Sequence, residues 1–418
     1  MAMRVLIISN LFPPFSLGGA EMAASSLAAR LAGGGHEVCV LTSAPRPAQE
    51  ESSRRADGVR IERRFFPNSY SVFEARARPV LHKAAWHFRD HFNRHSESIC
   101  RAVVEAFRPD IVNTHDLQGI GYNIVREIGR RGLPCVQTLH DLGFLCINMN
   151  MFRDGEACRR RHAPCAVSSL LKGAYLSTIK TLAFWSPSQA LLERYRPHLP
   201  RHVEAVSIPL PLRFSPPPEG IEARSAAPVR LLYAGQFTEP KGVGFLLETL
   251  EPLAEGNRFE LALAGGGPLL ERLKEKYAGK TWVSFAGRLP PEEVAGFMAR
   301  GDLLMIPSLW FENSPVVAYQ AGQLGLPILA SNVGGLPELV RDGVNGLLLP
   351  AGDAERWRAC VRDLLARPEK LDRLREGAKA NAKNFDPDLL GGAVVRLFER
   401  TLRAASAPAR AVYTEADA

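Results

Sequence analysis

No apolar run in this chain approaches the roughly 20 residues that a membrane-spanning helix needs. The first apolar run, 5–8, is short and has neither a charged start nor a small-residue cleavage site, so we expect a strand and not a signal peptide. The seven cysteines are an odd number in a long chain, which argues against a disulfide framework. These absences predict a cytoplasmic protein.

The positive charge of the chain is not accompanied by a nucleic-acid-binding signature. Residues 1–200 carry 26 Lys and Arg against 17 Asp and Glu, whereas residues 201–418 carry 26 against 27. Because no zinc-finger, RNA-recognition or helix-turn-helix pattern occurs in the basic half, we expect no nucleic-acid partner. Two interpretations of the basic half stay open. Its charge is scattered over solvated faces, or it makes peripheral contact with the inner face of an anionic membrane.

Length and hydrophobic pattern predict the architecture. The 418 residues exceed one ordinary hydrophobic core, so two domains are expected. Short continuous runs of Val, Ile and Leu alternate with helical patterns, which is typical of strands buried on both faces of parallel sheets. The predicted fold class is therefore α/β, with two doubly wound, Rossmann-like domains. The expected strands are 4–9, 37–42, 111–115, 135–139, 229–234, 259–264, 283–286, 303–307, 327–330 and 346–349.

A stretch rich in Pro, Ser and Ala, with weak periodicity, is interpreted as a linker at 215–228. It separates an N-terminal domain, 1–214, from a C-terminal domain, 229–387. A final helix is expected at 388–403, followed by a small, polar, disordered tail at 404–418.

The most informative stretch is 307–338. Glu312 lies in a turn before an apolar helical run, and a short buried strand follows at 327–331. The pair Gly334 and Gly335 then opens another expected helix. Helix starts carry unpaired N–H groups and a partial positive charge, so they attract anions. An acid beside two helix starts predicts a site that holds phosphates and orients a hydroxyl-rich group.

At these residues the chain resembles the nucleotide-sugar glycosyltransferases of family 4, which have the GT-B fold. The family's mark is Glu-x7-Glu followed by Gly-Gly-x-x-Glu; Glu312 is the first Glu here, but Gln320 occupies the second position. The glycine loop that ends at Glu21 matches the family's N-terminal motif. The resemblance covers nearly the whole chain and is strongest over 5–41 and 234–349.

The resemblance implies a retaining transferase of hexosyl type, acting in glycan, polysaccharide or glycoconjugate biosynthesis. Its two domains would face each other across a cleft, and the helix 388–403 would pack back on the first domain. The co-substrate would be a nucleotide diphosphate sugar with UDP or GDP, and no cofactor would be required. The acceptor would be a hydroxyl of a glycan, a lipid-linked glycan or a small molecule.

The same resemblance assigns roles to residues. Glu312, His140 and Lys241 would be catalytic, and the compact cation of Lys241 suits a diphosphate. Many family members have Arg where this chain has Gln236, so one fixed cation stands where others have two. The implied donor-binding residues are Gly18, Gly19, Gln236, Lys241, Gly265, Gly287, Arg288, Leu289, Asn313, Ser314, Val316 and Gln320.

Some candidate residues keep two interpretations. His115 and His140 end expected parallel strands, where ligands bind in open α/β sheets, and an Asp follows each. For His115 and Asp141, contact with the sugar or acceptor and a structural role both remain open. Glu21 contacts the acceptor in one interpretation and is a first-turn helix acid in the other.

Metal chemistry has little support in the sequence. The one Asp-x-Asp is 386–388, where Asp388 is better explained as a helix-start residue, so no catalytic metal is expected. Four possible zinc ligands fall within twenty residues, the alternative being reduced thiols in an ordered loop. They are Cys146, Cys158, His162 and Cys165.

Two further functions stay open. A nucleotide-sugar epimerase of GT-B fold would need no acceptor. A non-catalytic GT-B scaffold in a polysaccharide assembly complex would explain Gln236 and Gln320. Separately, residues 76–101 mix basic and aromatic side chains, as expected of a basic amphipathic helix on an anionic membrane or of an ordinary surface helix.

Overall fold

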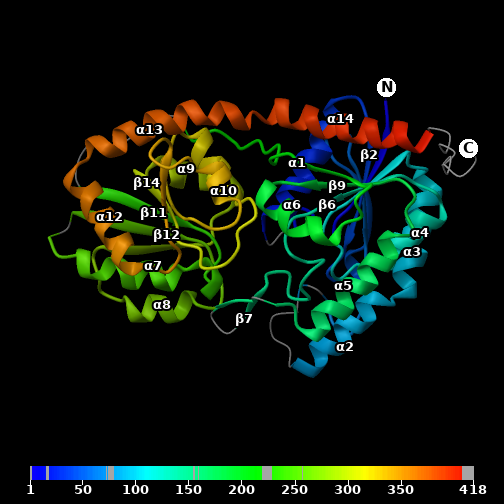
Figure 1. Cartoon of the computed structure of the whole chain (residues 1–418), viewed down its shortest axis with the longest axis horizontal. Coiled ribbons are helices and arrows are strands. Elements are labelled where there is room, and N and C mark those ends of the chain that lie inside the picture. Colours follow the sequence, from blue (N-terminus) through cyan, green and yellow to red (C-terminus); the bar gives the residue numbers. More distant parts are fainter. Residues whose placement is uncertain are drawn as a thin grey trace, which may run out of the picture.

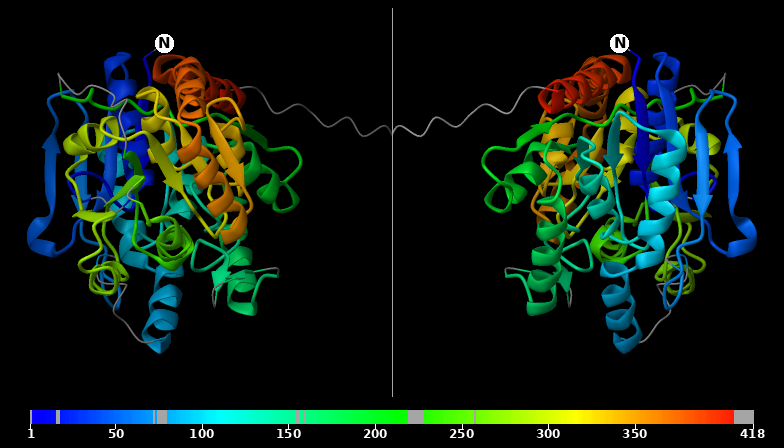
Figure 2. Two further views of the ribbon diagram at one scale, coloured as in Figure 1. Left: turned by 90° about the vertical axis from the view of Figure 1, so that its left-hand side faces the viewer. Right: turned by 90° about the vertical axis from the view of Figure 1, so that its right-hand side faces the viewer.

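The computed structural model describes residues 2–15, 18–71, 73, 80–153, 156–158, 160–218, 228–256 and 258–406. It has two lobes that lie side by side, each built around a mainly parallel sheet with helices against it (Figures 1 and 2). The first lobe contains an eight-stranded sheet and the second lobe a six-stranded sheet. The predicted α/β fold with two Rossmann-like domains is thereby confirmed.

In the first lobe the strand order is β10-β9-β6-β5-β1-β2-β4-β3. Only the β3–β4 pair of this sheet is antiparallel among the described residues. Its strands are β1 (Arg4–Ile8), β2 (Glu37–Ser43), β3 (Glu51–Arg54), β4 (Arg60–Arg64), β5 (Ile111–Thr114), β6 (Cys135–Thr138), β9 (Leu182–Ser186) and β10 (Glu204–Ser207). A separate two-stranded sheet is formed by β7 (Phe152–Arg153) and β8 (Glu156–Ala157).

In the second lobe the strand order is β13-β12-β11-β14-β15-β16, and the pairs are parallel. Its strands are β11 (Val229–Ala234), β12 (Phe259–Ala264), β13 (Val283–Gly287), β14 (Leu303–Ile306), β15 (Ile328–Ser331) and β16 (Gly346–Leu349). The carboxyl ends of β11, β12 and β14 lead into the loops that face the first lobe, so this sheet positions loops where open α/β sheets bind ligands.

The helices of the first lobe are α1 (Gly19–Gly33), α2 (Val80–His91), α3 (Arg94–Phe107), α4 (Ile124–Arg130), α5 (Ala163–Leu176) and α6 (Gln189–Tyr195). Those of the second are α7 (Val243–Leu250), α8 (Leu270–Lys276), α9 (Pro291–Ala299), α10 (Val316–Gln323), α11 (Leu336–Leu339), α12 (Ala354–Ala366) and α13 (Glu369–Asn381). The last helix is α14 (Pro387–Ser406).

Helix α14 leaves the second lobe and lies along the first (Figure 1). Asp388 in its first turn forms ion pairs with Arg30 of α1 and Arg213, and Arg400 forms one with Glu204 at 2.8 Å. The helix continues to Ser406, so the tail expected from 404 begins as ordered helix; residues 407–418 lie outside the described residues. Residues 219–227 of the expected linker also lie outside them.

One of the hydrophobic cores runs from one lobe into the other. The stretch before the expected linker lies in this core: Leu210 is buried, and its N–H donates to the Tyr319 hydroxyl at 3.1 Å. The Ser26 hydroxyl donates to the Pro211 carbonyl at 2.7 Å. Apolar burial across this junction, together with α14, holds the two lobes against each other.

Candidate active site

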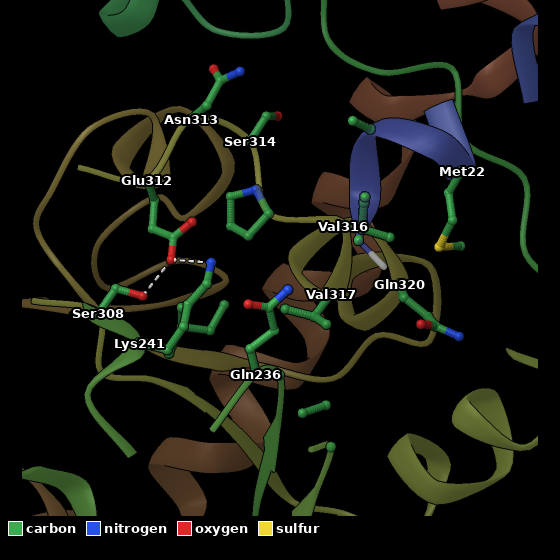
Figure 3. A pocket seen from close by; sticks show the side chains of 18 of the residues that line it. Met22, Gln236, Lys241, Ser308, Glu312, Asn313, Ser314, Val316, Val317 and Gln320 are labelled. Carbon is green, nitrogen blue, oxygen red and sulfur yellow. Dashed lines mark hydrogen bonds and ion pairs between the residues drawn. The ribbon is translucent and has the colours of Figure 1, made fainter. Parts of the chain in front are cut away.

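A cavity of about 620 Å³ lies between the two lobes and is lined by residues from both. Figure 3 shows its side chains, with Glu312, Lys241 and Ser308 converging from the second lobe and Met22 at the side of α1. Fourteen of the residues singled out in the sequence line it: Gly18, Gly19, His140, Asp141, Gln236, Lys241, Gly265, Arg288, Leu289, Glu312, Asn313, Ser314, Val316 and Gln320. Glu21, His115 and Gly287 are not among its lining residues.

Glu312 is the centre of this site and is only 5% exposed. One of its oxygens, Oε1, accepts hydrogen bonds from Lys241 Nζ at 2.7 Å, Ser308 Oγ at 2.6 Å and Trp310 Nε1 at 2.8 Å. Burial raises the pKa of Glu312, but Lys241 and the two neutral donors outweigh it, so the net pKa is lowered and the carboxylate is ionised. With Oε1 saturated, Oε2 is the atom left to accept from a ligand.

The backbone of Glu312 is held by the glycine pair that follows β15. Gly335 N–H donates to the Glu312 carbonyl at 2.8 Å. Gly334 has φ of +56°, and a Cβ there would lie 1.8 Å from the same carbonyl oxygen, so only glycine allows this approach. The helix predicted after this pair is α11, a single turn with Gly335 at its N-cap. The Gly335 amide donates to Glu312, and anion binding at this helix start stays a prediction.

Lys241 lies in a short 3₁₀ turn, Glu239–Lys241, before α7. Its ammonium pairs with Glu312 and sits 4.9 Å from the centre of the Trp310 ring. Three hydrogens are available on the ammonium, so pairing with one carboxylate oxygen leaves donors for a phosphate oxygen. The pair had no signal in the sequence, because 71 positions separate the two residues.

In the glycine loop before α1, one backbone amide that could bind an anion is already used by a side chain of the protein. The Glu21 carboxylate accepts from Gly18 N–H at 2.9 Å and so caps its own helix, which is the first-turn interpretation of this residue. Gly19 brings α1 against α10, because a Cβ there would lie 2.6 Å from Val316 Cγ2. The close approach of the two lobes thus requires glycine at position 19.

Asn313 and Glu338 join the lobes beside Glu312. Asn313 Nδ2 donates to the His140 carbonyl at 2.8 Å, and its Oδ1 accepts from Ser188 Oγ at 2.6 Å. The Glu338 carboxylate accepts from Gln189 N–H and Ala190 N–H, both at 2.8 Å, and therefore caps α6 of the other lobe. Asn313, expected to bind the donor, links the lobes through hydrogen bonds with a main-chain carbonyl and a serine hydroxyl of the first lobe.

The two strand-end histidines meet. His115 Nδ1 and His140 Nε2 are 2.7 Å apart, and His115 Nε2 lies 2.8 Å from Asn113 Oδ1. His140 reaches the cavity, whereas His115 is 2% exposed behind it. His115 therefore lies behind His140 and is not among the residues that line the cavity.

The sequence analysis missed Lys172 and Asp90, which belong to a buried group of charges together with Asp116 and Asp141. Lys172 of α5 donates to the Gly143 carbonyl at 2.6 Å and interacts with three acids, Asp90, Asp116 and Asp141. Burial raises the pKa of Asp90 to about 7 and, together with Asp116, that of Asp141 to about 8. One buried cation cannot balance three carboxylates, and burial raises the pKa of all three acids, which favours their protonated forms.

The four possible zinc ligands are not gathered into a site. Cys146 and Cys165 are buried, and all described cysteines are free thiols. Across the described part of the chain, no group of three or more His, Cys, Asp or Glu is arranged to hold a metal ion. The arrangement agrees with the alternative interpretation, reduced thiols in an ordered loop.

Two family descriptions match the chain: a glycosyl transferase 4-like domain over residues 18–211 and glycosyl transferases group 1 over 228–367. The chain is 25% identical over 414 residues to glycogen synthase of Mycobacterium tuberculosis, covering 95% of this chain and 94% of that protein. It is 34% identical over 143 residues to an amylovoran biosynthesis glycosyltransferase of Erwinia amylovora, a match that covers 32% of this chain and 35% of that protein.

Two solved structures show the same fold. Sucrose-phosphate synthase from Thermosynechococcus elongatus superposes with a TM-score of 0.76 at 19% identity, covering 96% of this chain and 100% of that chain. The Anabaena protein HepE in complex with UDP-glucose superposes with a TM-score of 0.65 at 15% identity, covering 95% of this chain and 100% of that chain.

Proposed function

The chain belongs to the family 4-type glycosyl transferases and has their GT-B fold, and from this premise we propose that it transfers a hexose with retention of anomeric configuration. The donor is a nucleotide diphosphate sugar, and the acceptor is a hydroxyl of a growing glycan, a lipid-linked glycan or a small molecule. The observation that carries this proposal is the ionised, buried Glu312 paired with Lys241 where the two lobes meet.

The geometry supports this chemistry because negative charge grows on the diphosphate as its bond to the anomeric carbon of the donor sugar breaks. Preorganised donors stabilise such charge best, and Lys241 and the amides near Gly19 lie on the same cavity. Glu312 Oε2 can accept from sugar hydroxyls and hold the ring between the lobes. Enclosing the donor between the two lobes would keep water away from it and so prevent its hydrolysis.

Retention is proposed as same-face attack, with the acceptor hydroxyl losing its proton to the leaving diphosphate. Glu312 Oε1 is saturated by three donors, which makes this carboxylate an orienting group and a poor nucleophile. An NMR assignment of the anomeric configuration of donor and product tests this step, and inversion would contradict it.

The donor is proposed to carry UDP or GDP, and HepE, which shares the fold, is recorded with UDP-glucose. A thermal-shift screen of nucleoside diphosphates and their sugars identifies it, because a ligand at 100 times its Kd stabilises the fold by about 2.7 kcal/mol. An increase in Tm with one base and not the others is expected; no increase with any would contradict nucleotide binding.

Two alternatives are separated by turnover. An epimerase would convert the donor sugar without an acceptor, whereas a transferase releases nucleoside diphosphate at a rate that depends on the acceptor. A non-catalytic scaffold is favoured only by the two glutamines, Gln236 and Gln320, that stand where the family has charged residues. Such a scaffold would bind the sugar nucleotide without converting it, and would therefore produce no free nucleoside diphosphate.

We expect Gln320 to replace the family's second Glu as the group that holds the donor ribose. Gln320 is 5% exposed on α10 and lines the cavity. Its amide can accept from and donate to a ribose diol, but such a neutral hydrogen bond contributes roughly 0.5–1.5 kcal/mol against about 1.5–3 for a charged one. Gln320→Ala should raise the donor KM about two- to tenfold and barely change kcat, because the ribose is held alike in ground and transition states.

The matched variant is Gln320→Glu, which should keep activity and lower the donor KM. Calorimetry with the nucleoside diphosphate is the measurement. If neither the wild type nor Gln320→Glu binds any nucleotide while Gln320→Ala stays folded, the transferase proposal is wrong.

We also propose peripheral contact of the first lobe with the cytoplasmic face of an anionic membrane. No helix in the described ranges has the length and apolar character to cross a bilayer. The single amphipathic helix expected over 76–101 is instead two helices, α2 and α3, separated at Asn93, and residues 76–79 lie outside the described ones. Trp86, one of the aromatic side chains within 76–101, is 3% exposed and stacks on Tyr70, so it is not available to a membrane surface.

The apolar surface comes from α2 and α5 together, at the foot of the first lobe (Figure 1). Phe88 is 67% exposed, Phe92 48% and Leu170 75%. The two helices touch through His91 Nε2 and Ser168 Oγ at 3.0 Å. Beside Phe92 lies a second cavity, of about 580 Å³, lined by Arg94, Arg101, Arg126 and Arg130 and by Glu97, with which Arg126 and Arg130 pair. Aromatic side chains beside basic ones are what an anionic lipid surface binds.

Flotation with vesicles of phosphatidylcholine containing phosphatidylglycerol tests this contact. We expect binding that weakens with salt and is reduced in Leu170→Ser, because the exposed leucine would enter the interface. Leu389→Ser is the matched control, because Leu389 is 62% exposed on α14. Helix α14 runs along the top of the molecule in Figure 1, whereas α2 and α5 lie at the bottom. Equal binding by both variants, or none by the wild type, would contradict the proposed surface.

A further inference from the structure

Three polar side chains form a chain from the interior of the first lobe to the cavity. Asn113 lies on β5, His115 follows that strand, and His140 follows the neighbouring strand β6. His115 Nε2 is 2.8 Å from Asn113 Oδ1, and His115 Nδ1 is 2.7 Å from His140 Nε2. Asn113 and His115 are buried at 0% and 2% exposure, whereas His140 lines the cavity. Each hydrogen bond in this chain constrains the next.

The inner end is fixed by a main-chain carbonyl. Asn113 Nδ2 donates to the Val136 carbonyl at 2.8 Å and to Thr138 Oγ1 at 3.0 Å. A carbonyl only accepts, so the amide cannot be turned round, and Oδ1 must be the atom that faces His115. Because that oxygen also only accepts, the proton of His115 is on Nε2.

At the outer end of the chain, the position of the proton on His140 follows because both histidine rings are neutral. Burial and the neighbouring His140 lower the pKa of His115 well below its usual value, and burial lowers the pKa of His140 to about 4. A neutral His115 with its proton on Nε2 has a bare Nδ1, which accepts a hydrogen bond from the N–H at His140 Nε2. His140 must then have no proton on its own Nδ1.

His140 lines the cavity, and its second ring nitrogen, Nδ1, is not used in the contact with His115. This nitrogen makes no hydrogen bond with any residue that the structure describes, and it is absent from the buried, unpartnered nitrogens and oxygens of those residues, unlike His91 Nδ1. The free atom of His140 is therefore a hydrogen-bond acceptor.

We propose that Asn113 and His115 are positioning residues that fix the tautomer of His140, so that His140 Nδ1 accepts a hydrogen bond from a hydroxyl of the transferred sugar. This rests on the proposed function in so far as the donor sugar lies beside His140. A bare nitrogen repels a phosphate oxygen and favours a hydroxyl. The relay therefore makes this part of the cavity select a sugar that carries a hydroxyl there over the corresponding deoxy sugar.

The direct test is ¹⁵N NMR of the histidine rings in the full-length protein at pH 7, with the His140 signals assigned by their loss in His140→Ala. We expect a protonated Nε2 and a bare Nδ1 in the wild type without any ligand. A protonated Nδ1, or a charged ring, would overturn the relay. This measurement needs no turnover, so its failure is distinct from failure of the transferase proposal.

Two variants and a titration complete the test. Asn113→Asp should place a proton on His140 Nδ1, because a buried carboxylate favours a charged His115, which would then donate through its own Nδ1. His115→Phe keeps a ring but removes the hydrogen bond, and should lower kcat about two- to tenfold with unchanged affinity for the nucleoside diphosphate. If both variants leave the wild-type tautomer of His140 in place, the two residues do not position it.

The titration uses UDP, GDP and their glucose and mannose derivatives. The His140 Nδ1 signal should shift with a bound sugar nucleotide and stay unchanged with the bound nucleoside diphosphate alone. A shift with the diphosphate alone would overturn the sugar contact. The same is true if a sugar nucleotide binds without moving the signal.

Discussion

Glu312→Gln should reduce turnover about 10²–10³-fold, the range found when one preorganised polar contact to a developing charge is removed. The substitution keeps the shape of the side chain, and an amide oxygen can still accept from Lys241, Ser308 and Trp310. What changes is the position of Glu312 Oε2, where a charged acceptor facing the sugar is replaced by an amide N–H donor. Steady-state kinetics with the identified donor measure the effect.

Nucleotide affinity separates this account from a simple loss of folding. Without the negative charge of Glu312, Lys241 is freed for the phosphates, so the nucleoside diphosphate should bind equally well or more tightly. Glu239→Gln is the matched control, because Glu239 is an exposed acid two positions from Lys241 that does not line the cavity. Wild-type turnover in a folded Glu312→Gln variant would refute the role given to this residue.

Lys241→Ala should weaken binding of the nucleoside diphosphate about tenfold to one-hundredfold, because a charged hydrogen bond contributes roughly 1.5–3 kcal/mol. The structure adds a second effect: Glu312 loses the cation that lowers its pKa and would be left buried with two neutral donors. Calorimetry with the diphosphate measures the first effect, and the pH dependence of turnover reports the second.

A double variant distinguishes direct phosphate binding from neutralisation of Glu312. If Lys241 acts only by neutralising the acid, Lys241→Ala combined with Glu312→Gln should recover the affinity of the wild type for the diphosphate. If Lys241 contacts the phosphates, as we propose, the double variant stays weak. Equal affinity of Lys241→Ala and the wild type would contradict any phosphate contact.

The parallel sheets could be predicted because their strands are continuous apolar runs. Three expected strands have the observed bounds: β11, β12 and β16. Strand β4 had no such signal, because it reads Arg-Ile-Glu-Arg-Arg. Its charges are satisfied only in the folded state, where buried Glu62 pairs with Arg60 and Arg64, and Arg63 donates to the Pro13 carbonyl at 2.9 Å. Tertiary partners, and not propensity, place this strand in the sheet.

In the candidate site too, some features have a local sequence signal and others depend on tertiary contacts. Glu312 could be singled out because a local motif surrounds it, and most of the residues assigned with it line one cavity. The three donors that converge on its Oε1 depend on the conformation of the loop between β14 and α10 and on a lysine 71 positions away. Lys172 had no sequence signal at all, since it lies on α5 and meets its acids only when the first lobe folds.

Release of nucleoside diphosphate from the identified sugar nucleotide tests the central claim most directly, measured with and without a mixture of oligosaccharide and lipid-linked acceptors. The account predicts release that rises with acceptor, leaves a new glycoside, and falls about 10²–10³-fold in Glu312→Gln. Nucleotide binding without release, or release that is the same in Glu312→Gln and the wild type, would contradict it.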